Sequence, residues 1–198
     1  MLVSDRAYGA VPDGHPANRQ LLYLPTPRTT NNASSPPLEV VINEWMADNT
    51  ATIADAADND LEDWFELYNY GDTVADLGGF YLSSTITNRT KFRIPEGYTI
   101  PAHRYLLVWA DDEADQNNTN SSELHVNFKL ARSGEAIGLF APDGSTTIDY
   151  VTYAHQAPDV TEGRFPDGGS SLLMLDQPTP LGPNFLLQPN RPPQLESI

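Results

Sequence analysis

Apolar and polar residues alternate along much of this 198-residue chain, which is the pattern of half-buried β-strands. The segments EVVINEW (39–45) and DWFELYNY (63–70) alternate with a period of two, and RYLLVWA (104–110) is a short apolar run. Residues 135–153 hold two more alternating segments around the turn Pro142-Asp143-Gly144, which predicts a hairpin.

Three shorter strands are expected where Gly or Pro interrupts apolar residues, at residues 77–82, 92–95 and 98–101. No window keeps a helical period for about 11 residues. Many short strands separated by turn signals are typical of two packed antiparallel sheets. The pattern therefore predicts an all-β fold, an immunoglobulin-like antiparallel β-sandwich.

One phrase occurs twice in the chain. YGAVPDGHPANRQLLYLPTP at residues 8–27 is matched by EGRFPDGGSSLLMLDQPTP at residues 162–180. Aligning Gly9 with Gly163 places the copies 154 positions apart, and Pro-Thr-Pro follows in each with a one-residue slip. Because this separation is about the length of one domain, we interpret the phrase as the closing segment of a repeated module.

Proline-rich stretches divide the chain further. Residues 25–38 and the final LQPNRPPQLESI have the composition of extended linkers. We expect residues 5–24, which carry apolar side chains, to pack on the complete module or on another copy. The expected order is the closing segment of a preceding repeat (1–32), a linker (33–37), a complete β-sandwich (38–187), and a linker with the start of a following domain (188–198).

Five motifs in sequence order carry a family resemblance. They are VVINEWMADN, DWFELYNYGDTVADLGGFYLSS, KFRIPEGYTIPAHRYLLVWADDE, LHVNFKLARSGEAIGLFAPDG, and GRFPDG followed by PTPLGPN. Together they resemble the lamin-tail domain in its bacterial form over about residues 38–187, and residues 5–32 resemble its closing part. The resemblance implies an Ig-like sandwich of about nine strands and a non-catalytic module of large exported or surface proteins. No nuclear or filament role is carried over, because the chain lacks the heptads of a lamin rod.

Composition limits the partners. The chain has 27 Asp and Glu against 11 Lys and Arg, a formal net charge of −16 at pH 7, which repels polyanions and argues against a nucleic-acid partner. No apolar run reaches about 18 residues, so no membrane span is expected. The absence of cysteine excludes disulfides and thiolate metal sites.

Catalytic signatures are missing from the sequence. There is no G-x-S-x-G elbow, phosphate-binding loop or H-E-x-x-H motif. The histidines lack the spacing of metal ligands and are interpreted as surface or packing residues: His15, His103, His125 and His155. We therefore expect that the chain is not an enzyme.

One strand offers a candidate glycan-binding face. If Phe65 and Leu67 point into the core, the strand's alternation places Trp64, Glu66 and Tyr68 on the opposite face. Exposed aromatic rings stack on sugars, so these three residues are candidate ligand-binding residues. The alternative is that the aromatic residues belong to the core.

Acidic residues gather in two loops, DAADNDLED (55–63) and DDEAD (111–115). Crowded carboxylates repel one another unless they spread into solvent or share a cation. Glu44 alternates with Val40 and Ile42, so its carboxylate is expected in line with core residues, where an unpaired charge is costly. The hypothesis is one weakly bound calcium ion, with the candidate ligands Glu44, Asp55, Asp58, Asp60 and Asp63.

Two alternatives to this calcium site remain open. The loop could be merely solvated, and Glu44 could accept hydrogen bonds from backbone amides or pair with an arginine such as Arg89 or Arg93.

The sequence favours a non-catalytic module of a large secreted or cell-surface bacterial protein, acting as a spacer or as an adhesion and interaction domain. Its expected partners are the neighbouring domains of the parent chain, and a protein or a glycan. The alternatives are a carbohydrate-binding module and an accessory domain of an exported multidomain hydrolase.

Overall fold

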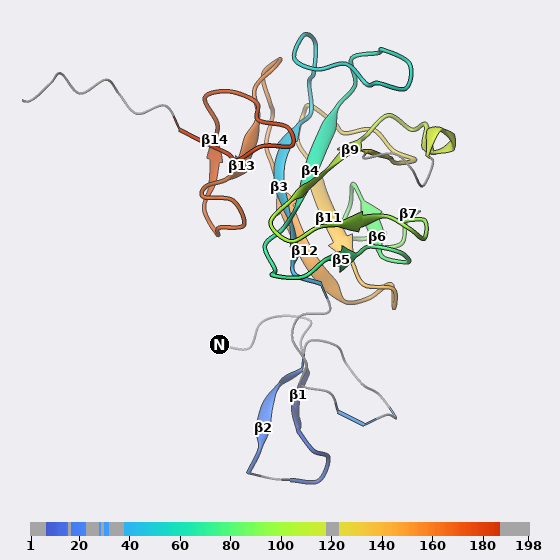
Figure 1. Ribbon diagram of the computed structural model, residues 1–198, viewed down its shortest axis with the longest axis vertical. Helices are drawn as coiled ribbons and strands as arrows, with labels where there is room; N and C mark the ends of the chain where they lie inside the picture. The colour runs from blue at the N-terminus through green and yellow to red at the C-terminus, as the bar shows by residue number, and fades with distance from the viewer. Residues whose placement is uncertain are drawn as a thin grey trace, which may run out of the picture.

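Two β-sheets packed face to face form the body of the protein in the computed structural model (Figure 1). The structure describes residues 7–15, 17–22, 28, 30–31, 38–117 and 123–186, so the expected linker at 33–37 and the segment 188–198 lie outside the described residues. The prediction of an all-β, Ig-like sandwich is confirmed. Within the described residues the elements are β1 (Ala7–Ala10), β2 (Arg19–Leu22), β3 (Val40–Met46), β4 (Trp64–Asn69), β5 (Ala75–Asp76), β6 (Tyr81–Ser83), β7 (Phe92–Arg93), β8 (Thr99–Ile100), β9 (Tyr105–Trp109), the 3₁₀ turn η1 (Ala114–Gln116), β10 (Glu123–His125), β11 (Ala136–Phe140), β12 (Thr147–Thr152), β13 (Glu162–Arg164) and β14 (Leu172–Met174).

The larger sheet has the strand order β10-β9-β4-β3-β13-β14, and the sheet facing it has the order β12-β11-β6-β7. The strands pair antiparallel, except that β10 runs parallel to β9. The predicted hairpin around Pro142-Asp143-Gly144 is β11 and β12. β3 and β4 lie at the centre of the larger sheet.

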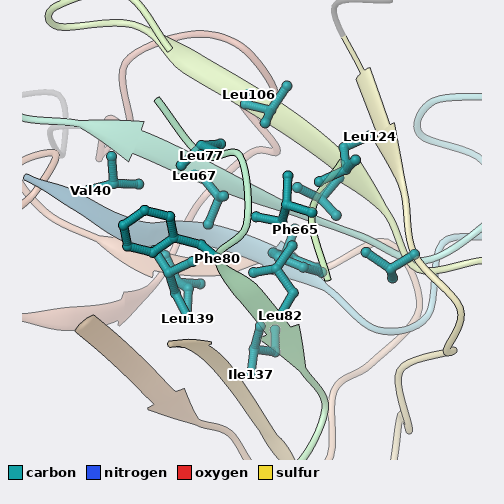
Figure 2. Packing of buried hydrophobic residues seen from close by; sticks show 14 of the residues in the cluster. Val40, Phe65, Leu67, Leu77, Phe80, Leu82, Leu106, Leu124, Ile137 and Leu139 are labelled. Carbon is teal, nitrogen blue, oxygen red and sulfur yellow. The ribbon is translucent and has the colours of Figure 1, made fainter. Parts of the chain in front are cut away.

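The core lies between the two sheets. Figure 2 shows side chains from the larger sheet, including Phe65 and Leu67, meeting Leu82, Ile137 and Leu139 from the opposite sheet. All five are fully buried. Full burial of one such side chain stabilises the fold by about 1.5–3 kcal/mol, so this apolar layer is what holds the two sheets together.

A β-bulge at Asn43 changes which side of β3 faces the core. Ile42 pairs with Leu67 and Glu44 pairs with Glu66, so Asn43 is the extra residue. Val40 and Ile42 point inward before the bulge, and Trp45 points inward after it. The expectation that Glu44 aligns with the core residues is therefore wrong, because the bulge moves its side chain to the outer face of the sheet.

A buried ion pair fastens β13 to the opposite sheet. Arg164 Nη2 lies 2.9 Å from Asp149 Oδ2 on β12, and both side chains are largely buried. Arg164 Nε donates to Ile42 O, and Ile42 N donates to Asp149 Oδ2 at 2.8 Å. The pair thus satisfies the backbone groups of Ile42 beside the bulge, where the sheet ladder is interrupted.

The repeated phrase forms the same hairpin twice. In the first copy Tyr8 pairs with Leu21 and Ala10 with Arg19; in the second, Glu162 pairs with Met174 and Arg164 with Leu172. The first strand is offset by 154 positions and the second by 153, so the one-residue slip in the sequence lies in the turn between the strands.

Two hydrogen bonds also recur in the hairpins. Asn31 Nδ2 donates to Ala10 O, and Asn31 N donates to Asp13 Oδ1. At the equivalent positions, Asn184 Nδ2 donates to Arg164 O and Asn184 N to Asp167 Oδ1. The two segments therefore share a register and a polar clasp as well as a sequence.

The two hairpins differ in their neighbours. β13 pairs with β3 inside the six-stranded sheet, whereas β1 and β2 form a sheet of their own. In Figure 1 the β1–β2 hairpin lies apart from the sandwich. Among the described residues β1 and β2 pair with no strand of the sandwich, and the packing of residues 5–24 on the complete module or on another copy stays a prediction. No helix in the described part of the chain is long and apolar enough to cross a membrane.

Candidate functional site

The outer face of β4 is buried. Trp64 packs with Met46, Leu107 and Trp109, and Ile53 from the loop before β4 lies against this group. The side chains of Trp64 and Glu66 have no exposed area. The expected exposed face is therefore wrong, because a loop covers the side of the sheet that the alternation assigns to solvent.

Tyr68 is the third candidate residue on this face, and it is half-buried. Its ring centroid lies 4.9 Å from that of Tyr105 on β9. The Tyr105 hydroxyl donates to Asp167 Oδ2 at 2.7 Å, in the turn of the closing hairpin. The two tyrosines thus support the hairpin turn, and with Trp64 buried they do not form the aromatic platform that was expected.

Glu44 and Glu66 face each other across β3 and β4, and both are fully buried. The segment after β14 covers them. Thr179 N and Thr179 Oγ1 donate to the Glu44 carboxylate at 3.0 and 2.8 Å, and Leu181 N donates to Glu66 Oε2. Glu44 is therefore held by a backbone amide and a hydroxyl, one of the alternatives to a cation, and neither Arg89 nor Arg93 forms a described ion pair with it.

Burial and the nearby Glu44 carboxylate raise the pKa of Glu66 to about 9. Burial also raises the pKa of Glu44, although the Thr179 hydrogen bonds oppose that shift. Two neighbouring buried carboxylates do not both ionise readily, and their coupling raises the pKa of Glu66, while the Thr179 donors stabilise the ionised form of Glu44.

The two acidic loops meet at one end of the sandwich. Asp55, Glu62 and Asp111 each offer an oxygen within 4.8 Å of the others, and Asp58, Glu62 and Glu113 form a second such group. A third group joins Asp55 to Glu123 and His125. Strand pairing explains the meeting, because β9 lies between β4 and β10 and ends beside the start of β4.

The structure brings only two of the five predicted calcium ligands into the acidic groups. Asp55 and Asp58 belong to these acidic groups, whereas Glu44, Asp60 and Asp63 belong to none of those found among the described residues. Glu44 lies under the closing segment, and Asp63 Oδ1 accepts a hydrogen bond from Asn49 N.

Five other residues in the groups were not assigned to the site from the sequence: Glu62, Asp111, Glu113, Glu123 and His125. The interpretation of His125 as a surface or packing histidine misses its carboxylate partners, since its Nδ1 lies 2.6 Å from Asp111 Oδ2. The sequence signal available was the second acidic loop at 111–115, directly after a predicted strand.

Comparison with known proteins identifies one matching family. The family model described as Lamin Tail Domain matches residues 33–155. No curated protein matches the chain. The match ends before β13 and β14, although β13 pairs with β3 in the same sheet as the matched strands.

Proposed function

The chain belongs to the lamin tail domain family, whose Ig-like domains are generally non-catalytic, and from this premise we propose that it is one repeat in a series of such domains in a larger exported or surface protein. In this role the module serves as a spacer or as an interaction domain. The recurrence of the closing hairpin is the observation that carries the proposal.

The first hairpin has the strand register and hydrogen bonds that the second hairpin uses to join the sandwich. In the second copy, the clasp residue Asn184 also donates to Asn43 O on β3, and Gly168 N donates to Asn43 Oδ1. The first copy has the same register and Asp–Asn clasp in Asp13 and Asn31. A strand equivalent to β3, in a preceding module, would complete the same arrangement.

A chimera tests this assignment. In it, residues 159–185 of the complete module are replaced by residues 5–32, joined in the aligned register. If the first hairpin is a closing segment, the chimera folds cooperatively, whereas the same module cut after Pro158 does not. Circular dichroism melts and the dispersion of amide proton resonances measure the difference.

One position in the chimera requires its own control. Ala10 replaces Arg164, which leaves Asp149 without its buried partner. Breaking such a pair destabilises a fold by about 3–5 kcal/mol, so we expect the Ala10→Arg chimera to be clearly more stable than the parent chimera. Failure of both chimeras to fold would contradict the proposal, as would folding of the module without any hairpin.

A further inference from the structure

Two buried carboxylate oxygens beside the acidic loops have no hydrogen-bond partner among the described residues. They are Asp55 Oδ2 and Glu62 Oε2. Asp55 is 1% exposed, and its other oxygen accepts the Ala57 backbone N–H at 2.8 Å. The nearest protein cation to Asp55 Oδ2 is His125 Nδ1, at 3.4 Å, beyond hydrogen-bond geometry. A buried carboxylate oxygen that accepts no hydrogen bond is unfavourable, so these two atoms point to a bound cation.

The oxygens around them are spaced as one cation requires. Calcium binds oxygen at about 2.3–2.6 Å, so two oxygens on one ion lie at most about 5 Å apart. One carboxylate oxygen from each of Asp55, Glu62 and Asp111 lies within 4.8 Å of the other two, which meets this condition. Glu62 also belongs to the group with Asp58 and Glu113, so it lies where the two groups join.

Positive charge from the protein only partly compensates these carboxylates. Lys129 Nζ lies 3.8 Å from Glu62 Oε1, and its side chain is 66% exposed, so solvent screens the pair. The carboxylates of Asp55, Glu62 and Asp111 therefore repel one another, and a cation bound between them relieves that repulsion.

His125 does not offer its Nδ1 atom to a metal bound by the Asp55, Glu62 and Asp111 group. Its Nδ1 lies 2.6 Å from Asp111 Oδ2 and 3.4 Å from Asp55 Oδ2. Carboxylates are acceptors, so Nδ1 carries the proton and is not available as a ligand. It instead orients two of the oxygens, as a second layer of residues does around many bound metals.

An approach from solvent exists beside Glu62. A cavity of about 350 Å³ is lined by Asp60, Leu61, Glu62, Asp63, Ala110 and Lys129. Glu62 thus borders both the buried acidic group and a cavity that an ion can enter.

We propose that Asp55, Glu62 and Asp111 bind one calcium ion, with Asp58 and Glu113 at its outer side. This differs from the set expected from the sequence, since Glu44, Asp60 and Asp63 take no part in it. The ion joins the loop before β4 to the loop after β9.

Isothermal titration of the full 198-residue chain with calcium chloride tests the site directly. We expect one ion per chain, and melts in calcium at a hundredfold excess over Kd rise by about 5–10 °C relative to chelator. Glu62→Gln and Asp55→Asn are expected to weaken calcium binding by at least about tenfold. Both changes remove negative charge from a crowded cluster, and a chelator melt of each variant establishes that it is folded.

Asp112→Asn is the matched control. Asp112 neighbours Asp111, lies outside the acidic groups of the described residues, and has a φ of 66°, which asparagine tolerates. We expect it to bind calcium as the parent chain does. The proposal is overturned if the parent chain binds no calcium, if it binds zinc but not calcium, or if folded Glu62→Gln and Asp55→Asn variants bind calcium with unchanged affinity.

Discussion

At the scale of single residues, the buried pair Glu44 and Glu66 links the closing segment to the centre of the larger sheet. Each carboxylate accepts hydrogen bonds from residues more than a hundred positions later in the chain. Only a sheet face covered by that later segment can keep both glutamates out of water. The protonation of this pair therefore reports on whether the closing segment is docked.

The stability of the protein should decrease as pH rises because of Glu66. Its pKa is about 9 in the folded state against an ordinary 4.5, so the folded state holds a proton that the unfolded state releases between these values. The free energy of unfolding then falls with pH by up to about 1.4 kcal/mol per unit from this group. Urea unfolding at pH 5, 7 and 8.5 measures the slope.

Glu66→Gln isolates this contribution from other titrating groups. Glutamine resembles the protonated acid, so the variant should match the parent near pH 5 and exceed it in stability at pH 8.5. Glu96→Gln, at an exposed position, is the control and should retain the parent slope. Identical slopes for Glu66→Gln and the parent would show that Glu66 is ionised in the folded protein.

At the scale of elements, the closing hairpin depends on a very close approach between β13 and β3. A Cβ atom added to Gly163 would lie 2.8 Å from Asn43 O and 2.8 Å from Asn184 Nδ2. A Cβ atom added to Gly9, in the first hairpin, would likewise lie 2.9 Å from Asn31 Nδ2. Both copies of the phrase thus have glycine at this position because a larger residue would collide with the asparagine side chain that closes the hairpin.

Gly163→Ala should destabilise the protein by about 1–3 kcal/mol, because the new methyl group meets backbone that cannot move without breaking the β3 pairing. Gly182→Ala in the same closing segment is the control, since its nearest neighbour, Thr179 O, would be 3.5 Å from the added atom. Urea unfolding compares the two variants. Equal stability of both would mean that β13 does not approach β3 this closely.

At the scale of the whole molecule, the two hairpins should contribute very differently to stability. The chain without residues 1–32 should melt within about 1 °C of the full chain, since β1 and β2 pair with no strand of the sandwich. The chain cut after Pro158 should lose its cooperative transition, because it exposes Glu44, Glu66 and the edge of β3. Calorimetry measures both. A loss of several degrees in the first truncation would show that the first hairpin packs on the module.

The sequence pattern predicts the strands and their core-facing residues, but not which loops cover the other face of each strand. Alternation correctly assigns Phe65 and Leu67 to the core. The repeated phrase shows that two segments are related, but not that each folds as a hairpin. The burial of Trp64 could not be predicted, because period-two alternation does not show that the loop before β4, with Ile53, folds back over this face of the sheet. The bulge at Asn43 likewise has no signal in a period-two pattern, and it reverses the orientation expected for Glu44.

The acidic site shows the same limit. The loop at 55–63 was identified from its composition, but the grouping of Asp55 with Asp111 depends on β4 and β9 being neighbours. Strand order is a long-range property that local patterns do not encode, so the residues were visible in the sequence and their association was not.

The recurrence of the hairpin means that β3 has two possible partners of similar sequence in the chain. About 35 residues separate Gly9 from Glu44 on β3, whereas about 119 separate Glu44 from Gly163, so loop-closure entropy favours the earlier hairpin as a partner for β3 by about 1 kcal/mol. That hairpin also leaves the ribosome first. The two copies differ at the position where it matters: Arg164 forms the buried pair with Asp149, and Ala10 stands in its place in the earlier copy. Leaving Asp149 without a buried partner costs more than this entropic advantage, so Arg164 is expected to favour β13 over β1 as the partner of β3.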